Sequence, residues 1–127
     1  TCGDLVAFIR SLPFDYETEH YIFVHAGLDL TLPDWHETTD YQKVWIRQPF
    51  HEATNQTGKT IVFGHTPVHY LLDQKIGTKE LWVTEDGKIG MDGGAVYGGV
   101  LHGILFDESG MRADVALVND GFAAIDD

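Results

Sequence analysis

The chain has 127 residues, a length that corresponds to one domain or to part of one. Hydrophobic residues make up 43% of it and charged residues 22%, which excludes a disordered tail. Eight Lys and Arg stand against 20 Asp and Glu, and the resulting formal net charge of -12 argues against binding to nucleic acid or to an anionic membrane surface.

The first third of the sequence predicts one helix and one buried strand. Apolar residues at helical spacing between Leu5 and Leu12 predict a short amphipathic helix that packs on a sheet and ends at Pro13. Residues 15–20 are polar and are expected to form a turn. The continuous apolar run of residues 21–24 is typical of a strand that is buried on both faces.

The middle of the chain predicts a loop, a short helix and a second buried strand. Residues 28–39 lack a clear period and are expected to be a loop. Residues 41–47 can form one or two helical turns, with Asp40 as the candidate N-cap. Residues 60–63 repeat the apolar pattern of residues 21–24 and predict a strand of the same kind.

The last third of the sequence predicts antiparallel β-structure. Strands are expected at residues 81–83, 88–92, 100–106 and 111–118. The Asp86-Gly87 pair predicts a tight hairpin between the first two strands. The glycines within residues 93–99 predict a bend where the backbone takes unusual angles or approaches another group closely. We therefore expect a single α/β or α+β unit whose sheets are covered on one side.

Two histidines follow the two buried strands directly. His25 is followed by Ala26-Gly27, and His65 is preceded by Gly64. In α/β sheets ligands bind beyond the carboxyl ends of the strands, and neutral imidazole is the commonest metal ligand in proteins. The pair therefore indicates a metal site. The alternative is that each histidine caps its strand and hydrogen-bonds to a loop.

Four segments of the sequence carry a family resemblance when they are taken in order. They are YIFVHAGL (21–28), VWIR (44–47), TIVFGHTPV (60–68) and IGMDGGAVYGGVL (89–101). Together they resemble bacterial serine/threonine protein phosphatases of the calcineurin-like metallophosphoesterase superfamily. A single Gly-His-Thr is a weak signal, whereas the ordered set is specific.

The resemblance implies a fold, a cofactor and roles for three residues. The fold would be part of an α/β/β/α sandwich whose C-terminal half is rich in antiparallel β-structure. Two divalent ions (Mn, Fe or Zn) would activate a water for in-line attack on phosphorus. His25 and His65 would be metal ligands, and Arg47 would clamp the phosphate through its guanidinium. The alternative for Arg47 is a surface ion pair on a very acidic protein.

Other residues have weaker indications. Asp92 is expected either to orient a loop or metal ligand, or to be a turn residue before two glycines. Tyr97 is expected to pack rather than to line a substrate pocket. Residues 68–70 are expected to be extended after Pro67, which leaves His69 exposed or locally bonded. Core or loop anchors are expected at Trp35, Trp45 and Trp82. No role is predicted for His20, His36, His51 and His102.

The opening motifs of the family do not occur in this chain. In the family, Asp-x-His, Gly-Asp-x-x-Asp-Arg and Gly-Asn-His supply the remaining ligands. We therefore expect residues 1–127 to be a single partial domain, the C-terminal portion of a metallophosphoesterase catalytic domain, with little or no activity by itself. The alternatives are a non-catalytic β-rich binding module and a hydrolase of the diadenosine tetraphosphatase type.

Partners and location follow from the same features. The expected substrate is a phosphorylated protein or a small phosphoester, and the VWIR and DGGAVY stretches favour a protein phosphatase. Exposed strand edges would permit homo-oligomers or strand exchange. The single cysteine, Cys2, suits a reducing cytoplasm. No apolar run reaches the roughly 18 residues of a membrane span, and no signal-peptide pattern is present.

Overall fold

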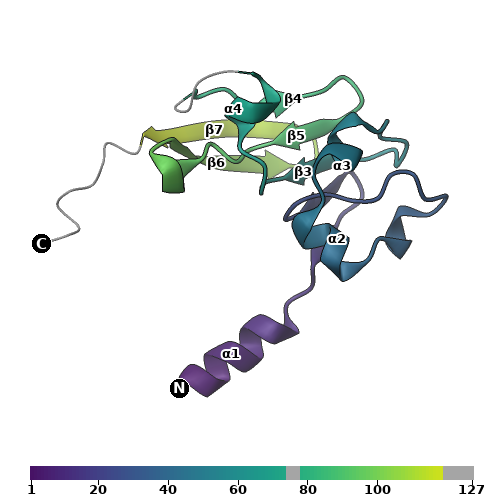
Figure 1. Ribbon diagram of the computed structural model, residues 1–127, viewed down its shortest axis with the longest axis vertical. Helices are drawn as coiled ribbons and strands as arrows, with labels where there is room; N and C mark the ends of the chain where they lie inside the picture. The colour runs from purple at the N-terminus through teal and green to yellow at the C-terminus, as the bar shows by residue number, and fades with distance from the viewer. Residues whose placement is uncertain (74–77, 119–127) are drawn as a thin grey trace, which may run out of the picture.

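The computed structural model describes residues 1–73 and 78–118, and its fold is mixed α+β (Figure 1). The strands are β1 (Asp15–Glu17), β2 (Tyr21–Val24), β3 (Thr60–Phe63), β4 (Trp82–Val83), β5 (Lys88–Gly90), β6 (Val100–Asp107) and β7 (Gly110–Val118). The helices are α1 (Cys2–Ser11), α2 (Asp40–Trp45), α3 (Gln48–Glu52) and α4 (Val68–Leu71), with 3-10 turns η1 (Trp35–Glu37) and η2 (Ala95–Tyr97). None of the described helices combines the length and the apolar character that crossing a membrane requires.

The larger sheet has five strands in the order β1-β2-β3-β5-β4, and the remaining two strands, β6 and β7, form an antiparallel hairpin. The central strands β2, β3 and β5 are parallel, whereas β1 and β4 pair antiparallel at the two edges. Ile22 lies opposite Ile61, and Val62 lies opposite Ile89. Because the central strands run the same way, their carboxyl ends meet at one edge of the sheet. Both predicted buried strands are confirmed, as β2 and β3.

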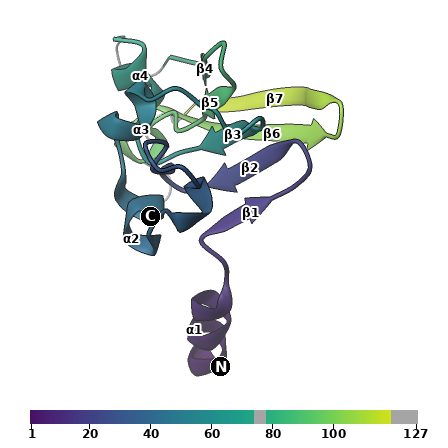
Figure 2. The same ribbon diagram turned by 90° about the vertical axis from the view of Figure 1, so that its right-hand side faces the viewer.

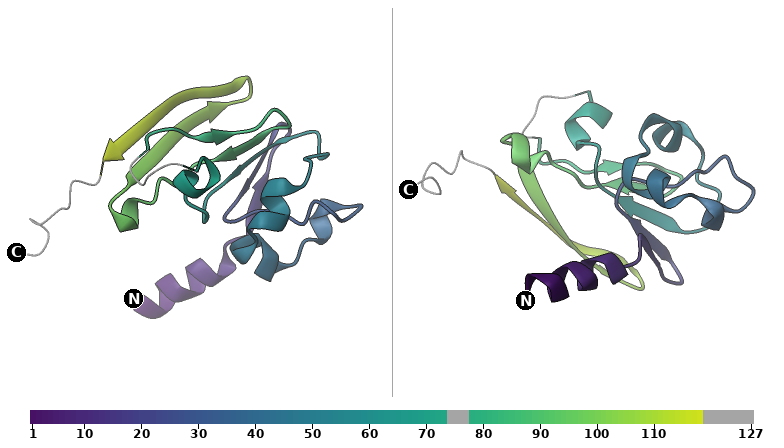
Figure 3. Two further views of the ribbon diagram at one scale, coloured as in Figure 1. Left: turned by 45° about the horizontal axis from the view of Figure 1, so that its top comes forward. Right: turned by 60° about the horizontal axis from the view of Figure 1, so that its bottom comes forward.

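The central sheet is covered on both faces, so the expectation of sheets covered on one side was wrong for it. Alternate side chains of a strand point to opposite faces. On one face, Ile22 and Phe63 pack against Phe50 of α3. On the other face, the Tyr21 ring meets the Phe106 ring of β6 with centroids 5.1 Å apart. The sheet therefore lies between a layer of short helices and the β6–β7 hairpin (Figures 2 and 3).

Helix α1 forms where it is predicted, but it does not pack on the sheet. It starts with a capping box, in which the Thr1 hydroxyl accepts a hydrogen bond from the Asp4 amide and the Asp4 carboxylate accepts one from the Thr1 backbone nitrogen. All of its residues are exposed, Phe8 to 59%, and it stands apart from the sheets (Figures 1 and 2). The packing prediction was wrong because helical spacing defines an apolar face and does not define its partner.

The segments around residues 15 and 40 differ from the prediction in detail. Residues 15–17 form the edge strand β1 and not a turn, because their backbone pairs with β2 while their polar side chains stay largely exposed. Helix α2 is capped by Thr39 rather than by Asp40. The Thr39 hydroxyl accepts from the Gln42 amide, and the Gln42 side chain accepts from the Thr39 amide. This capping box satisfies two free amides and places Asp40 in the first helical turn.

Helix α4 forms at residues 68–71, where the sequence predicts an extended segment. Pro67 occupies the N-cap position, where its missing N–H is no disadvantage. The Val68 amide donates to the carbonyl of Asp92 over 2.6 Å. A contact from a distant loop therefore starts this helix. Helix α3, with Pro49 in its first turn, also has no counterpart among the predicted elements.

The β4–β5 and β6–β7 pairings match the predicted strands. The predicted close approach of the backbone at the glycine-rich bend is also confirmed. A Cβ on Gly93 would overlap the carbonyl oxygen of Val100, and a Cβ on Gly99 would overlap that of Gly93. Only glycine permits this bend, which places Asp92 and η2 beside the ends of the central strands.

Candidate metal and phosphate site

Three neighbouring parallel strands end beside one hollow. His25 directly follows β2, His65 follows β3 after one glycine, and Asp92 lies two residues beyond β5. With Arg47 these side chains line a hollow of about 520 Å³. Ligand sites in α/β sheets are formed at this position, beyond the carboxyl ends of parallel strands. The predicted meeting of His25 and His65 at neighbouring strand ends is therefore confirmed as geometry, and their binding of metal stays a prediction.

The two imidazoles have the separation of a pair that shares an ion. Their ring centroids lie 5.1 Å apart, and their planes are tilted by 56°. Two histidines on one tetrahedral ion, with metal–nitrogen bonds of about 2.0–2.1 Å, have ring centres about 5 Å apart. The donor type suits Zn or Fe, since imidazole binds both, whereas Mn is expected from the family resemblance alone. His25 and His65 therefore fit a shared divalent ion.

The backbone at His65 is strained. Its φ angle is +67°, in the left-handed region that residues with a Cβ avoid. The Thr66 amide donates to the Gly64 carbonyl over 2.7 Å, so a three-residue turn is centred on His65. Such conformations cost about 1–3 kcal/mol and persist where the surroundings enforce them. The turn directs the imidazole toward His25 and Arg47.

Backbone contacts join the ends of β2 and β3 to each other and to the helix layer. The Gly64 amide donates to the carbonyl of His25 over 2.8 Å, and the Ala26 amide donates to the carbonyl of Lys43 in α2 over 2.8 Å. A Cβ on Gly27 would overlap the ring of Phe50, so the loop after β2 lies directly on α3. The histidines are therefore carried by segments fixed to the sheet and to the helix layer.

The surroundings of His65 favour the neutral imidazole. Burial lowers the pKa of His65, and electrostatic repulsion from the His25 ring and the Arg47 guanidinium lowers it further, against the opposing effects of Asp92 and the Trp45 backbone. A neutral ring with a nitrogen lone pair is the form that binds a metal.

Arg47 is exposed and faces the histidine pair. Its Nε donates to Nε2 of His65 over 3.4 Å, a long hydrogen bond. This contact is neither of the two predicted interactions, since its partner is a ring nitrogen and not a carboxylate or a phosphate. The position nevertheless leaves the guanidinium at the wall of the hollow, where its remaining donors can reach a bound anion.

Asp92 combines the two functions that were predicted as alternatives. One of its carboxylate oxygens accepts from the Gly94 amide over 2.9 Å, as expected of a turn residue. Its carbonyl accepts from Val68 and thereby holds α4 against the bend. Its side chain also lines the hollow with His25 and His65. Asp92 therefore orients the loop and contributes a negative charge to the site.

Four more residues line the hollow although the sequence analysis did not favour a place for them there. Tyr97 is 73% exposed and lines the hollow, so the prediction that it packs in the interior was wrong. His69 also lines the hollow, and its Nδ1 is buried without a hydrogen-bond partner in residues 1–73 and 78–118. Tyr70 and Val96, which also line it, carried no signal in the sequence. Helix α4, which carries Tyr70, is joined to the loop of Asp92 by the hydrogen bond from Val68.

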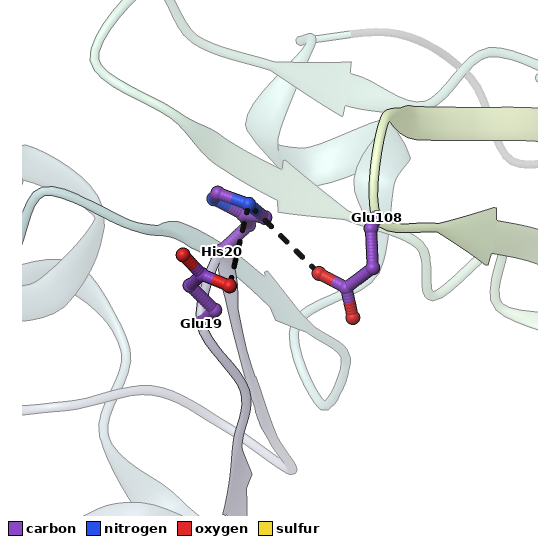
Figure 4. A group of neighbouring side chains, drawn as sticks. All are labelled: Glu19, His20 and Glu108. Atoms are coloured by element: carbon purple, nitrogen blue, oxygen red, sulfur yellow. Dashed lines mark ion pairs between the residues drawn. The ribbon is translucent and has the colours of Figure 1, made fainter.

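The only group of three potential metal ligands within the described ranges lies elsewhere. It consists of Glu19, His20 and Glu108, whose ligand atoms all lie within 4.8 Å of one another (Figure 4). All three are exposed, and the His20 ring is 4.0 Å from Glu19 and 3.9 Å from Glu108. His20 precedes β2 whereas His25 follows it, so the two sites lie at opposite ends of this strand. The His25–His65 pair therefore lacks a third ligand in the part of the chain that the structure describes.

The remaining histidines and the tryptophans make hydrogen bonds or ring contacts with neighbouring side chains. His36 pairs with Asp34 at 2.7 Å and with Glu17 at 2.9 Å. His102 is buried and its Nδ1 lies 2.9 Å from Asp114. Trp35 and Trp82 pack against the core, as predicted, and Trp45 is 55% exposed with its ring edge-on to His65. His51 stacks on Phe63 with centroids 5.5 Å apart.

Comparison with protein-family models, with curated proteins and with solved structures found no significant match to this chain.

Proposed function

We propose that this chain contributes part of the site of a metal-dependent phosphoesterase. His25 and His65 would hold one divalent ion, and Arg47 would bind the phosphoryl group. The observation that carries the proposal is the 5.1 Å separation of the two rings at the ends of adjacent parallel strands, with the Arg47 guanidinium against one of them. Imidazole is the commonest metal ligand in proteins, and guanidinium pairs bidentately with phosphate, so the pair and Arg47 together suit a metal and a phosphoryl group.

The layer order supports the same proposal. A sheet with helices on one face and a second β layer on the other is half of the α/β/β/α arrangement expected from the resemblance to bacterial serine/threonine protein phosphatases. On this proposal residues 1–127 are the C-terminal portion of such a catalytic domain. The substrate is a phosphomonoester, either on a protein or on a small molecule, in a cytoplasmic setting.

The residues of this chain have separate tasks in the proposed chemistry. A divalent metal, when bound, supplies Lewis acidity that activates water and offsets charge on the phosphoryl oxygens. His25 and His65 would hold that ion through ring nitrogens, and the lowered pKa of His65 favours the neutral form that this requires. Arg47 presents planar donors that match two phosphoryl oxygens and orients the phosphorus for attack.

Two imidazoles are an incomplete ligand set, since catalytic zinc sites use about three protein ligands. We propose that further ligands, carboxylates above all, come from a polypeptide segment that fills an adjoining groove. This groove has a volume of about 690 Å³, runs between the central sheet and the hairpin, and shares His25, His65 and Asp92 with the hollow. Its apolar walls include Phe23 and Val62. The chain alone should therefore bind metal weakly and turn over little substrate.

Metal titration of single variants tests the proposal. Calorimetric titration with Mn²⁺ or Zn²⁺ should show that His25→Ala and His65→Ala each weaken binding at least about tenfold, since each removes one of two ligands. Arg47→Ala should retain the metal and lose binding of inorganic phosphate. His36→Ala is the matched control, because His36 is bonded to carboxylates away from the hollow.

Two results would contradict this account. Metal affinity that is unchanged in both His25→Ala and His65→Ala would exclude the shared ion. Robust Mn²⁺-dependent phosphatase activity of the 127-residue chain, abolished by His65→Ala, would show that the ligand set is complete within it and that the incomplete-site proposal is wrong.

A non-catalytic β-rich binding module is the second candidate, and the outer face of the hairpin favours it. Leu101 of β6 lies opposite Leu117 of β7, and both are exposed. Leu105 and Val115 are exposed as well. An apolar face of this kind is typical of an interaction surface.

A further inference from the structure

Two tyrosines from different elements flank the hollow that contains the histidine pair. Tyr70 belongs to α4 and Tyr97 to η2, and both line the hollow together with Arg47. Tyr70 is 71% exposed and Tyr97 is 73% exposed. Their rings therefore reach the site from separate loops and remain open to solvent.

The two tyrosine side chains have few packing neighbours. The Tyr70 ring touches only one neighbouring ring among those described, that of His69, at a centroid distance of 4.3 Å. Val96, beside Tyr97, is also exposed and lines the same hollow. Scattered exposed apolar side chains are normal on proteins, but three on the rim of one polar hollow form an apolar collar around it.

We propose that Tyr70 and Tyr97 hold the planar leaving group of an aryl phosphate monoester whose phosphoryl group is bound at Arg47. The inference rests on the phosphoesterase function proposed above and narrows its substrate class. Aromatic side chains attract another ring through face-to-edge and offset contacts, beyond the area they bury. Tyrosine phosphate and free aryl phosphates have such a ring next to phosphorus, whereas serine phosphate has none.

The reaction of this substrate class balances with water alone. The water oxygen forms a bond to phosphorus, and the bond between phosphorus and the phenolic oxygen breaks. The phenolic oxygen takes up a proton that the water releases, so the products are a phenol and inorganic phosphate. A phenol ionises near pH 10, so its oxygen leaves with less assistance than an aliphatic one.

A binding experiment separates the ring contact from the phosphate contact. Calorimetric titration of the full chain in Mn²⁺ with phenyl phosphate and with methyl phosphate should give about three- to tenfold tighter binding of the phenyl ester. The double variant Tyr70→Leu/Tyr97→Leu, which keeps apolar side chains but removes both rings, should lose most of this preference. Tyr41→Leu is the control, because Tyr41 is equally exposed but does not line the hollow. O-phosphotyrosine and O-phosphoserine form a second pair of ligands and should show the same preference.

The outcomes distinguish this inference from the function on which it rests. Equal affinity of the intact chain for phenyl and methyl phosphate, or an unchanged preference in the double variant, overturns the aromatic subsite and leaves the phosphate site standing. If neither ester binds, or if binding survives Arg47→Ala unchanged, the proposed function fails and the aromatic subsite fails with it. Circular dichroism of the double variant establishes that it is folded.

Discussion

At the scale of single residues, His65 has the most unusual backbone among the residues of the candidate site. Its left-handed backbone would be relaxed in glycine, yet the position holds an imidazole. Strain of this kind is maintained when the side chain is needed where the turn directs it. The turn places the His65 ring beside the His25 ring and within hydrogen-bond distance of Arg47.

Two substitutions of His65 should have different effects on the free energy of unfolding but the same effect on metal binding. His65→Gly and His65→Ala both remove the ring, but only glycine relieves the positive φ. We expect the glycine variant to be more stable than the alanine variant by about 1 kcal/mol in urea unfolding, while both lose metal binding. The same pair of substitutions at His51 is the control, because His51 lies in helix α3, where alanine is favoured over glycine. A His65→Ala variant as stable as His65→Gly would show that the turn is not strained.

At the scale of elements, helix α3 is held to the sheet by a buried lysine and a half-buried histidine. The Lys88 ammonium, on β5, donates to the carbonyls of His51 and Ala53 and lies 3.7 Å from Asp86. The His51 ring stacks on Phe63 within the helix-side core. This attachment positions α3, on which the loop after β2 rests.

The His51 ring should make stability depend on pH. Burial lowers the pKa of His51 to about 4, and the charges of Lys88 and Arg47 contribute. The unfolded chain has the ordinary pKa of about 6.5, so between these two values it binds more protons than the folded chain. The free energy of unfolding should therefore fall as the pH drops from about 6.5 toward about 4, and less steeply in His51→Gln.

Urea unfolding at several pH values measures this difference. His36→Gln is the control with the opposite sign, because hydrogen bonds to Glu17 and Asp34 raise the pKa of His36. Its contribution is present below about pH 6.5 and is lost as the pH rises through its raised pKa. If the free energy of unfolding depends on pH equally in the intact chain and in His51→Gln, the lowered pKa of His51 is contradicted.

Element by element, sequence reasoning succeeded where local pattern and tertiary structure agree. Continuous apolar runs predicted β2 and β3, and the positions of His25 and His65 followed from them. It failed at α4 and β1, because a hydrogen bond from Val68 to Asp92 starts the helix and pairing with β2 makes the strand. Tyr70 lies on α4, so its place at the site could not be predicted, whereas for Tyr97 the less favoured of two predicted roles is the one observed.

At the scale of the whole molecule, apolar surface is left uncovered in two places. The outer face of the hairpin exposes Leu105 to 63%, together with Leu101 and Leu117, and helix α1 has no partner layer within the described residues. The net charge of -12 opposes association of copies at low salt. Apolar attraction and charge repulsion should therefore compete.

Light scattering should detect this competition. We expect the chain to form dimers or larger species at high concentration, and more so as salt screens the charge. The variant Leu105→Lys/Leu117→Lys should reduce association, and Tyr41→Lys, at an exposed position away from the hairpin, should have little effect beyond its added charge. A stable monomer under all these conditions would contradict a partial domain and favour a self-sufficient module.

The position of a bound ion tests the central claim most directly. In an NMR titration with Zn²⁺, which resolves the ring nitrogens of single histidines, the account predicts that signals of His25 and His65 shift together at the same ratio of ion to protein. Signals of His20, beside Glu19 and Glu108, should respond only at higher ratios. Binding that starts at His20, or that affects only one of the two rings at the strand ends, would contradict the shared metal site.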